Sequence, residues 1–304
     1  MVTVQDKTVR GKRMTRVFRF GLLLLLPTLP QAPAVAQTAA GDAPDKSGYT
    51  LFDPTPDDAM RSFCTDRPPK ANLPCSVDAG HLQYESDVFN WTRTQFGGVT
   101  TTTALFTNPT LKFGLTNRID FEMNMAPVET VTSQSASGRQ SFTGNGDLFL
   151  RTKFNLAGPE GGDFQAALIP FVKAPTAAPG IGNGAVEGGT IAPISFALPH
   201  DFTLLFDPEV DSLHNAGNTG QHANYQFLAN LSHPLPHNVT AYVELWGQLD
   251  DDPTARTRQA SLDLSLSWIA LDKLPNLQFD IGANIGLTPA TPKIQAFLGV
   301  SQRF

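Results

Sequence analysis

The chain has 304 residues, 41% of them hydrophobic, and carries 25 glycines and 24 prolines. Its formal net charge of -6 argues against nucleic acid as a partner, because binding to phosphate backbones relies on an excess of basic side chains. The mean hydropathy of -0.14 would suit a soluble protein. It also suits a transmembrane β-barrel, since half of each barrel strand faces a polar lumen.

The amino end has the three parts of a secretory signal peptide. Basic residues precede the apolar run 21–26, and helix-breaking residues then lead to Ala34-Val35-Ala36. This small-x-small site predicts cleavage after Ala36, so residues 1–36 are expected to be removed on export. The run is too short for a spanning helix, which needs about 20 apolar residues. Met1 and Met14 both stay open as the start of translation.

Residues 37–79 are expected to form a periplasmic extension, because they are rich in Pro, Asp and Gly and show no sustained periodicity. Both cysteines of the chain, Cys64 and Cys75, lie here. In an exported chain, two cysteines at this spacing predict a disulfide. Two arrangements of the extension are open. It is either a tethered segment outside the barrel, which we favour, or a plug that enters the barrel mouth.

From residue 80 the chain consists of runs of about ten residues in which apolar and polar side chains alternate. The clearest run sets Ile119 and Phe121 against Asp120 and Glu122. Such alternation is typical of strands with one apolar and one polar face. We count about twelve strands in residues 80–304. The sequence therefore predicts an all-β fold, a transmembrane antiparallel up-and-down β-barrel with a short N-terminal extension.

The connections between the predicted strands tend to alternate in length. Short turns at 116–117, 157–162 and 199–201 are expected on the periplasmic side. The polar stretches 127–146 and 174–189 are expected to be long loops. A soluble β-sandwich would also alternate in polarity, but it rarely needs so many strands in one up-and-down series.

The last predicted strand, residues 292–304, has an apolar face that ends on Phe304. It resembles the closing strand of bacterial outer-membrane barrels, whose terminal aromatic residue is read by the assembly machinery. Phe304 is therefore a candidate assembly signal. Outer-membrane lipid and the barrel assembly machinery are the partners that this interpretation implies.

Charged side chains recur on the face that would line a lumen. Parity places Asp120 and Glu122 inside on one strand, and Arg151 and Lys153 inside on the next, so that they form a band of mixed charge. Lys173 could extend this band, while an acidic strand lies elsewhere. The candidate permeation residues are Asp120, Glu122, Arg151, Lys153, Lys173, Asp207 and Glu209.

An enzyme is the main competing function. Outer-membrane phospholipases pair a serine with a histidine, but Ser232 and His233 are adjacent, and adjacent strand residues point to opposite faces. The acidic run 250–252 offers oxygen ligands for a divalent cation, yet a solvated loop explains it better. We expect no catalytic residue, no metal and no cofactor. Transport of a small-molecule solute is favoured, with a lipid hydrolase or a non-conducting structural barrel as the alternatives.

The stretch 49–56, with the shorter motifs 65–68 and 77–81, resembles the segment that leads into the barrel of a bacterial outer-membrane transporter family. That family is labelled putative meta-pathway of phenol degradation. Residues 111–118 resemble its second and third strands, residues 169–176 and 187–193 resemble its middle, and the similarity spans nearly all of the mature chain. The resemblance implies an outer-membrane channel or transporter for small molecules, with hydrophobic or aromatic compounds as the substrate class.

Overall fold

The structure is a computed structural model that describes residues 45–217, 219–269 and 274–304. The expected signal peptide lies outside these residues. Among them, no helix has the length and apolar character to cross a membrane.

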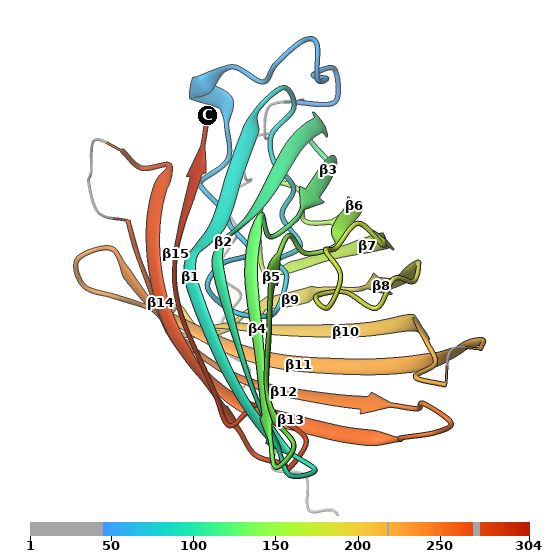
Figure 1. Ribbon diagram of the computed structural model, residues 1–304. Coiled ribbons are helices and arrows are strands. Elements are labelled where there is room, and N and C mark those ends of the chain that lie inside the picture. Colours follow the sequence, from blue (N-terminus) through green and yellow to red (C-terminus); the bar gives the residue numbers. More distant parts are fainter. Residues whose placement is uncertain (1–44, 218, 270–273) are drawn as a thin grey trace, which may run out of the picture. The chain divides into compact units, whose positions relative to one another are not determined.

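The described residues contain fifteen strands and one short 3-10 turn, η1 (Asp57–Ala59). All strand pairs are antiparallel, and β1 pairs with both β2 and β15, so the sheet closes on itself (Figure 1). The strands are β1 (Leu82–Phe96), β2 (Val99–Thr116), β3 (Ile119–Asn124), β4 (Val128–Ser135), β5 (Gly138–Gly144), β6 (Leu148–Ala157), β7 (Phe164–Ala174), β8 (Glu187–Ile191), β9 (Ile194–Ala197), β10 (Thr203–His214), β11 (Gln221–Leu235), β12 (Val239–Asp250), β13 (Thr257–Ile269), β14 (Leu277–Gly286) and β15 (Ile294–Arg303).

Three wall strands are interrupted, and this reconciles the fifteen segments with the predicted number. β3 and β4 both pair with β2 and form the first interrupted strand. β6 pairs with β3 and β5 pairs with β4, so β5 and β6 form the second. β8 and β9 both lie between β7 and β10 and form the third. Pro127 and Pro193 stand at two of the breaks, where a residue without an N–H cannot join the ladder. Across the described chain the segments therefore form a closed barrel of twelve strands, as the sequence predicted.

The two faces of the wall are reversed relative to those of a soluble protein. On β14 the apolar side chains Phe279 and Ile281 are exposed, whereas Gln278 and Asp280 are buried. On β15 the same holds for exposed Leu298 against buried Ser301. A soluble protein buries its apolar residues. An apolar exterior around a polar interior is the pattern of a barrel that faces lipid.

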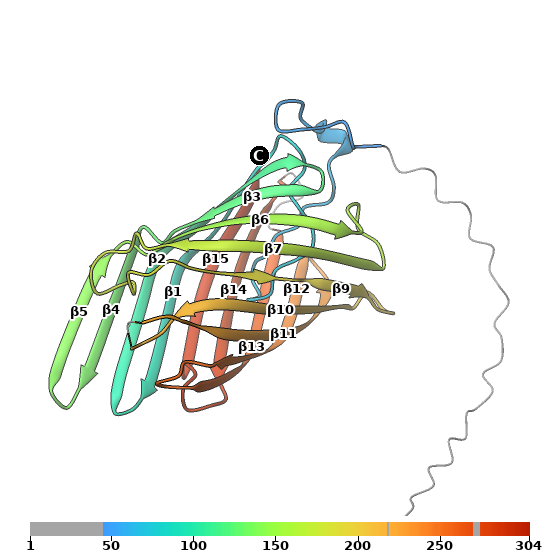
Figure 2. The ribbon, with the colours of Figure 1, turned by 90° about the vertical axis from the view of Figure 1, so that its right-hand side faces the viewer.

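Two stretches that we expected to be loops contain strands instead. Residues 128–144 form the hairpin β4–β5, which extends the barrel at the end opposite the C-terminus (Figure 2). Its polar side chains pair across the hairpin, with the hydroxyl oxygens of Thr130 and Thr143 3.0 Å apart. The hairpin buries no apolar face, so its sequence has no alternating polarity to reveal it. The short strand β8 begins at the end of the second expected loop and includes its last residues, Gly188 and Gly189. Glycine has weak strand preference, and this strand is ordered by its pairing with β7 and β10.

The segment before the wall differs from the arrangement that we favoured. The described residues form one compact unit. Within it, the chain from Thr50 to Ala79, which we call the inner segment, packs against the wall instead of being tethered outside it. The segment passes so close to β2 that a Cβ atom at Gly114 would collide with the carbonyl oxygen of Asp78. The boundary expected between residues 79 and 80 therefore separates the inner segment from the wall strands, and both belong to the same compact unit.

Candidate functional site in the barrel lumen

A disulfide between Cys64 and Cys75 closes a small ring in the inner segment, as the sequence predicted. We call residues 64–75 the inner loop. Its backbone carbonyl groups accept hydrogen bonds from wall side chains: Gln83 on β1 donates to Cys64, Gln278 on β14 to Arg67, and Asn155 on β6 to Pro74. The inner loop is therefore fastened to strands on opposite sides of the wall.

Arg67 makes the most extensive side-chain contact of the inner loop. Its Nε and Nη2 donate to the two carboxylate oxygens of Asp280 at 3.0 and 2.7 Å, and its Nη1 lies 2.8 Å from Asp87 Oδ1. The guanidinium carbon lies 5.7 Å from the centre of the Phe297 ring. A bidentate arginine–carboxylate pair combines strength with directional specificity, so this contact fixes the position of the loop.

Asp66 joins the inner loop to the opposite side of the wall. Its carboxylate is paired with Lys112 on β2 and lies 2.9 Å from Lys153 Nζ on β6. Both lysines are buried, and they also face Glu122, at 3.7 and 3.6 Å. Burial alone would raise the pKa of Asp66, but the two ammonium groups outweigh it and hold that pKa well below its usual range.

The middle of the inner loop contacts the strands β10 to β13. The backbone N–H groups of Lys70 and Ala71 donate to the carboxylate of Glu244 at 3.1 and 3.2 Å. Asn72 donates to Asp207 Oδ2 through its backbone N–H, at 2.7 Å, and through its side chain. Ala71 also packs on a small apolar patch made by Leu205 and Leu228, so both polar and apolar contacts hold this part of the loop.

The predicted band of mixed charge is present as a spatial cluster. Cross-strand register places Asp120 opposite Lys153, and Glu122 opposite Arg151. Asp120 accepts a hydrogen bond from the backbone N–H of Val77 at 2.9 Å. The guanidinium carbon of Arg151 lies 5.8 and 5.9 Å from the ring centres of Phe149 and Phe171, which are themselves 6.3 Å apart, so Arg151 contacts both rings from one side.

The other candidates lie elsewhere. Lys173 pairs with Glu187 at 2.7 Å and with Asp147 at 3.3 Å, so it belongs to a separate cluster and does not extend the band. Asp207 holds Asn72 of the inner loop, and Glu209 follows on the same face of β10.

Three residues that the sequence did not single out are central to this site. Lys112 stands between two apolar residues of a predicted strand, so the parity rule would have placed it in the lumen. Arg67 and Lys70 lie in an aperiodic segment, where no such rule applies. The signal for them is a set of charged side chains within a ring closed by two cysteines.

A narrow cavity lies between the inner loop and the band. It has a volume of ≈ 190 Å³ and is lined by Asp66, Lys70, Lys112, Glu122 and Arg151, among others. The inner loop therefore leaves a charged cavity on this side of the lumen.

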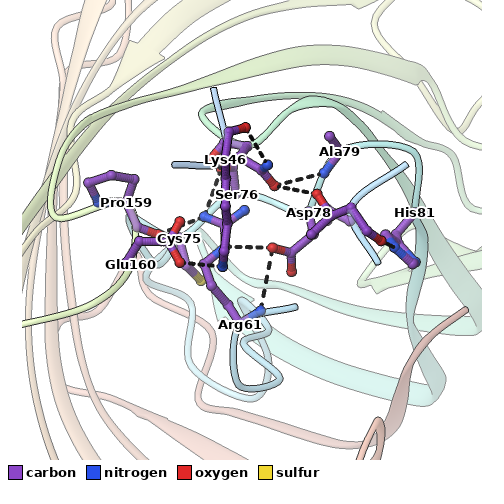
Figure 3. A network of polar contacts seen from close by, with 12 residues as sticks. Lys46, Arg61, Cys75, Ser76, Asp78, Ala79, His81, Pro159 and Glu160 are labelled. Atoms are coloured by element: carbon purple, nitrogen blue, oxygen red, sulfur yellow. Dashed lines mark hydrogen bonds and ion pairs between the residues drawn. The ribbon is translucent and has the colours of Figure 1, made fainter. Parts of the chain in front are cut away.

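A second polar network holds the inner segment at the C-terminal end of the barrel. Asp78 accepts a hydrogen bond from Arg61 Nε at 2.9 Å (Figure 3). Arg303 Nη1 donates to the same carboxylate at 3.0 Å, and all three side chains are buried. His81 bridges the inner segment and the chain end, because its two ring nitrogens lie 2.8 Å from the carbonyl oxygen of Thr55 and 3.0 Å from that of Phe304. These contacts tie the inner segment to the last strand.

The histidine weighed for a hydrolase, His233, lies against an aromatic ring. His233 stacks on the ring of Phe202, with centres 4.4 Å apart, and its Nδ1 is buried without a hydrogen-bond partner among the described residues. No hydrogen bond joins Ser232 to His233 among the described residues. Among all the residues that the structure describes, no group of three or more His, Cys, Asp or Glu residues lies close enough to hold a metal ion.

Comparison with solved structures identifies the fold. The COG4313 outer membrane channel from Pseudomonas putida F1 superposes with a TM-score of 0.57 at 13% identity, over 78% of this chain and 99% of that chain. The NanC porin gives a TM-score of 0.45 at 9% identity, over 73% and 98% of the two chains. The β domain of the Bordetella autotransporter BrkA gives 0.45 at 13% identity, over 74% and 99%. At 13% identity the first of these structures shows the fold alone, which is that of an outer-membrane barrel.

No curated protein sequence matches the chain. The family described as Putative MetA-pathway of phenol degradation matches residues 65–304, which is most of the chain and includes the inner loop except for Cys64. As the resemblance in its sequence predicted, the protein belongs to this family.

Proposed function

We propose that the protein is an outer-membrane channel for small solutes whose lumen is narrowed by the inner loop. The observation that carries the proposal is the closed wall with a polar interior, in which an aperiodic loop is held largely by hydrogen bonds and ion pairs. Such contacts exchange readily with water, unlike a packed apolar core. A loop held in this way can shift and widen the passage without unfolding the wall.

The charged band and its cavity are the proposed permeation path. Asp120, Glu122, Arg151 and Lys153 would act on a solute at close range, because charges that line a narrow pore are poorly screened. Asp207 and Glu209 would line the path on the other side of the inner loop, and Lys173 would act nearer the barrel end opposite the C-terminus. The family description suggests hydrophobic or aromatic compounds as solutes.

Export and assembly complete the proposal. Residues 1–36 would direct the chain out of the cytoplasm, and the end of the barrel that holds the inner segment and Phe304 would face the periplasm. Phe304 would then be available to the barrel assembly machinery, since its side chain is 61% exposed. A lipid hydrolase is not favoured, because Ser232 and His233 do not form a catalytic pair.

Conductance in planar lipid bilayers tests this function. Folded protein, recognised by its different migration with and without boiling, should give single-channel steps. Arg67→Ala should raise the conductance or the open fraction, because the loop then loses its bidentate contact with Asp280. Absence of steps from both folded proteins would refute the channel and leave a structural barrel.

A further inference from the structure

The inner faces of β1 and β12 to β15 carry more negative than positive charge. The bases on these strands, within the described residues, are Arg93, Arg258 and Arg303. The first two are exposed, and Arg303 is engaged with Asp78. Five buried carboxylates of this part of the wall are met by the inner loop instead: Glu85, Asp87, Glu244, Asp263 and Asp280.

The side chain of Lys70 occupies a site with three different components. Its Nζ lies 2.8 Å from Asp263 Oδ2, donates to Ser261 Oγ at 2.8 Å, and lies 4.5 Å from the centre of the Trp246 ring. A carboxylate, a hydroxyl acceptor and an aromatic face are the groups that recognise an ammonium ion. They come from two adjacent strands, β12 and β13, and so are positioned by the rigid wall.

The site is better buried than its occupant. The Lys70 side chain is 29% exposed, whereas that of Asp263 is 6% exposed. Asp263 Oδ1 is also buried and has no hydrogen-bond partner among the described residues, so the carboxylate can accept a further donor. A cavity of ≈ 210 Å³, lined by Lys70, Trp246, Ser261 and Asn284 among others, opens beside it. A small molecule therefore has room next to the ammonium position.

We propose that Trp246, Ser261 and Asp263 form a binding site for organic cations with a primary ammonium group, and that Lys70 fills this site in place of such a solute. The inference deepens the proposed channel function, on which it rests for delivery of the solute. The Arg67 site repeats the same chemistry for a guanidinium group, with Asp87, Asp280 and the Phe297 ring around it. A solute that takes the place of Lys70 removes one attachment of the inner loop, so binding favours the displaced loop.

Calorimetric titration of the detergent-solubilised full-length protein with butylammonium tests the site. Lys70→Ala empties it and should bind butylammonium at least ~10-fold more tightly than the wild type does, because the tethered competitor is gone. Lys70→Met is the matched control, since it keeps a side chain of similar length on Trp246 without the charge and should bind no more tightly than the wild type. Adding Asp263→Asn to Lys70→Ala should abolish the gain. Butanol, the neutral analogue, should bind to none of these proteins.

Equal affinity of wild type and Lys70→Ala for butylammonium, or equal binding of butanol, would overturn the proposal. Should Lys70→Ala not fold, Arg67→Ala titrated with butylguanidinium, with butylurea as the neutral analogue, puts the same question to the second site. The readout is binding and not current. A protein that binds butylammonium but gives no conductance would refute the channel function and support the ammonium site. A protein that conducts but does not bind butylammonium would support the channel function and refute the ammonium site.

Discussion

The guanidinium group of Arg67 lies against Gly299, and a Cβ atom at that glycine would collide with it. Gly299 on β15 stands between Asp87 on β1 and Asp280 on β14 in the strand register. The three residues form a row in which the central position lacks a side chain and both flanking positions carry a carboxylate. The missing side chain is what allows one guanidinium to reach both carboxylates.

Gly299→Ala should therefore weaken the docking of the inner loop while leaving the wall intact. The added methyl group forces Arg67 away from Asp280, at a cost of about 1–3 kcal/mol for such overpacking. Channel conductance or open fraction should rise. Gly247→Ala is the matched control, because the nearest atom to its new Cβ would be 4.0 Å away. Equal behaviour of the two variants would contradict the role given to Gly299.

The disulfide should restrict the inner loop. Closing so short a loop is worth about 3 kcal/mol in the chain-entropy model. Replacing Cys64 and Cys75 together by Ser should therefore increase the frequency of current fluctuations and expose residues 65–74 to protease. Labelling of the mature wild-type protein under denaturing, non-reducing conditions should find no free thiol. Two labelled thiols would show that the bond is absent from the mature protein.

Arg151 and Lys153 should set the charge of the passage. Replacing both by Glu places new carboxylates beside Glu122 and Asp120, so the reversal potential in a salt gradient should shift toward cations. Some loss of stability is expected as well, because like charges then face each other across the strands. Arg118→Glu together with Arg139→Glu makes the same change of net charge at two exposed positions. The band is not on the permeation path if both double variants have the reversal potential of the wild type.

The pH dependence of docking follows from Asp66. Its pKa is lower in the folded protein than in an unfolded chain, so its stabilising effect is complete above the unfolded value of about 4. The effect is lost only as the pH falls through the lower, folded value. We expect the conductance of the wild type to stay constant between pH 8 and pH 5 as far as this contact is concerned. Asp66→Asn should resemble the strongly acidic state at every pH, and its similarity to the wild type at pH 7 would contradict the prediction.

Deletion of Phe304 should reduce assembly. The backbone N–H of Phe304 donates to the carbonyl oxygen of Leu82 at 2.8 Å, so this residue adds a bond at the seam between β1 and β15 besides its exposed ring. The fraction of heat-modifiable protein in outer membranes measures the effect. Phe304→Tyr keeps both the ring and the backbone bond and should assemble normally. Normal levels of the deletion variant would exclude Phe304 as the assembly signal.

The wall of the barrel was predictable and the inner loop was not, for one physical reason. Polarity alternates along a strand that separates lipid from a polar lumen. The side chains of Asp120, Glu122 and Lys153 could therefore be assigned to the lumen from their parity in the sequence. Asp66, Arg67 and Lys70 lie in a segment without regular structure, and their partners are far away in sequence. The hairpin β4–β5 was missed for a related reason, because both of its faces meet a polar environment.

Arg67 has a second consequence, which concerns the joint where the first and last strands of the wall meet. Asp87 and Asp280 lie on either side of β15, so a single side chain links the beginning of the sheet to its end. The residues brought together at this joint are about 200 positions apart, and closing so long a stretch of chain carries an entropic cost. The inner loop thus helps to hold the cylinder shut as well as to fill it. Deleting the loop would change permeability and mechanical integrity at once, and only single substitutions can separate the two.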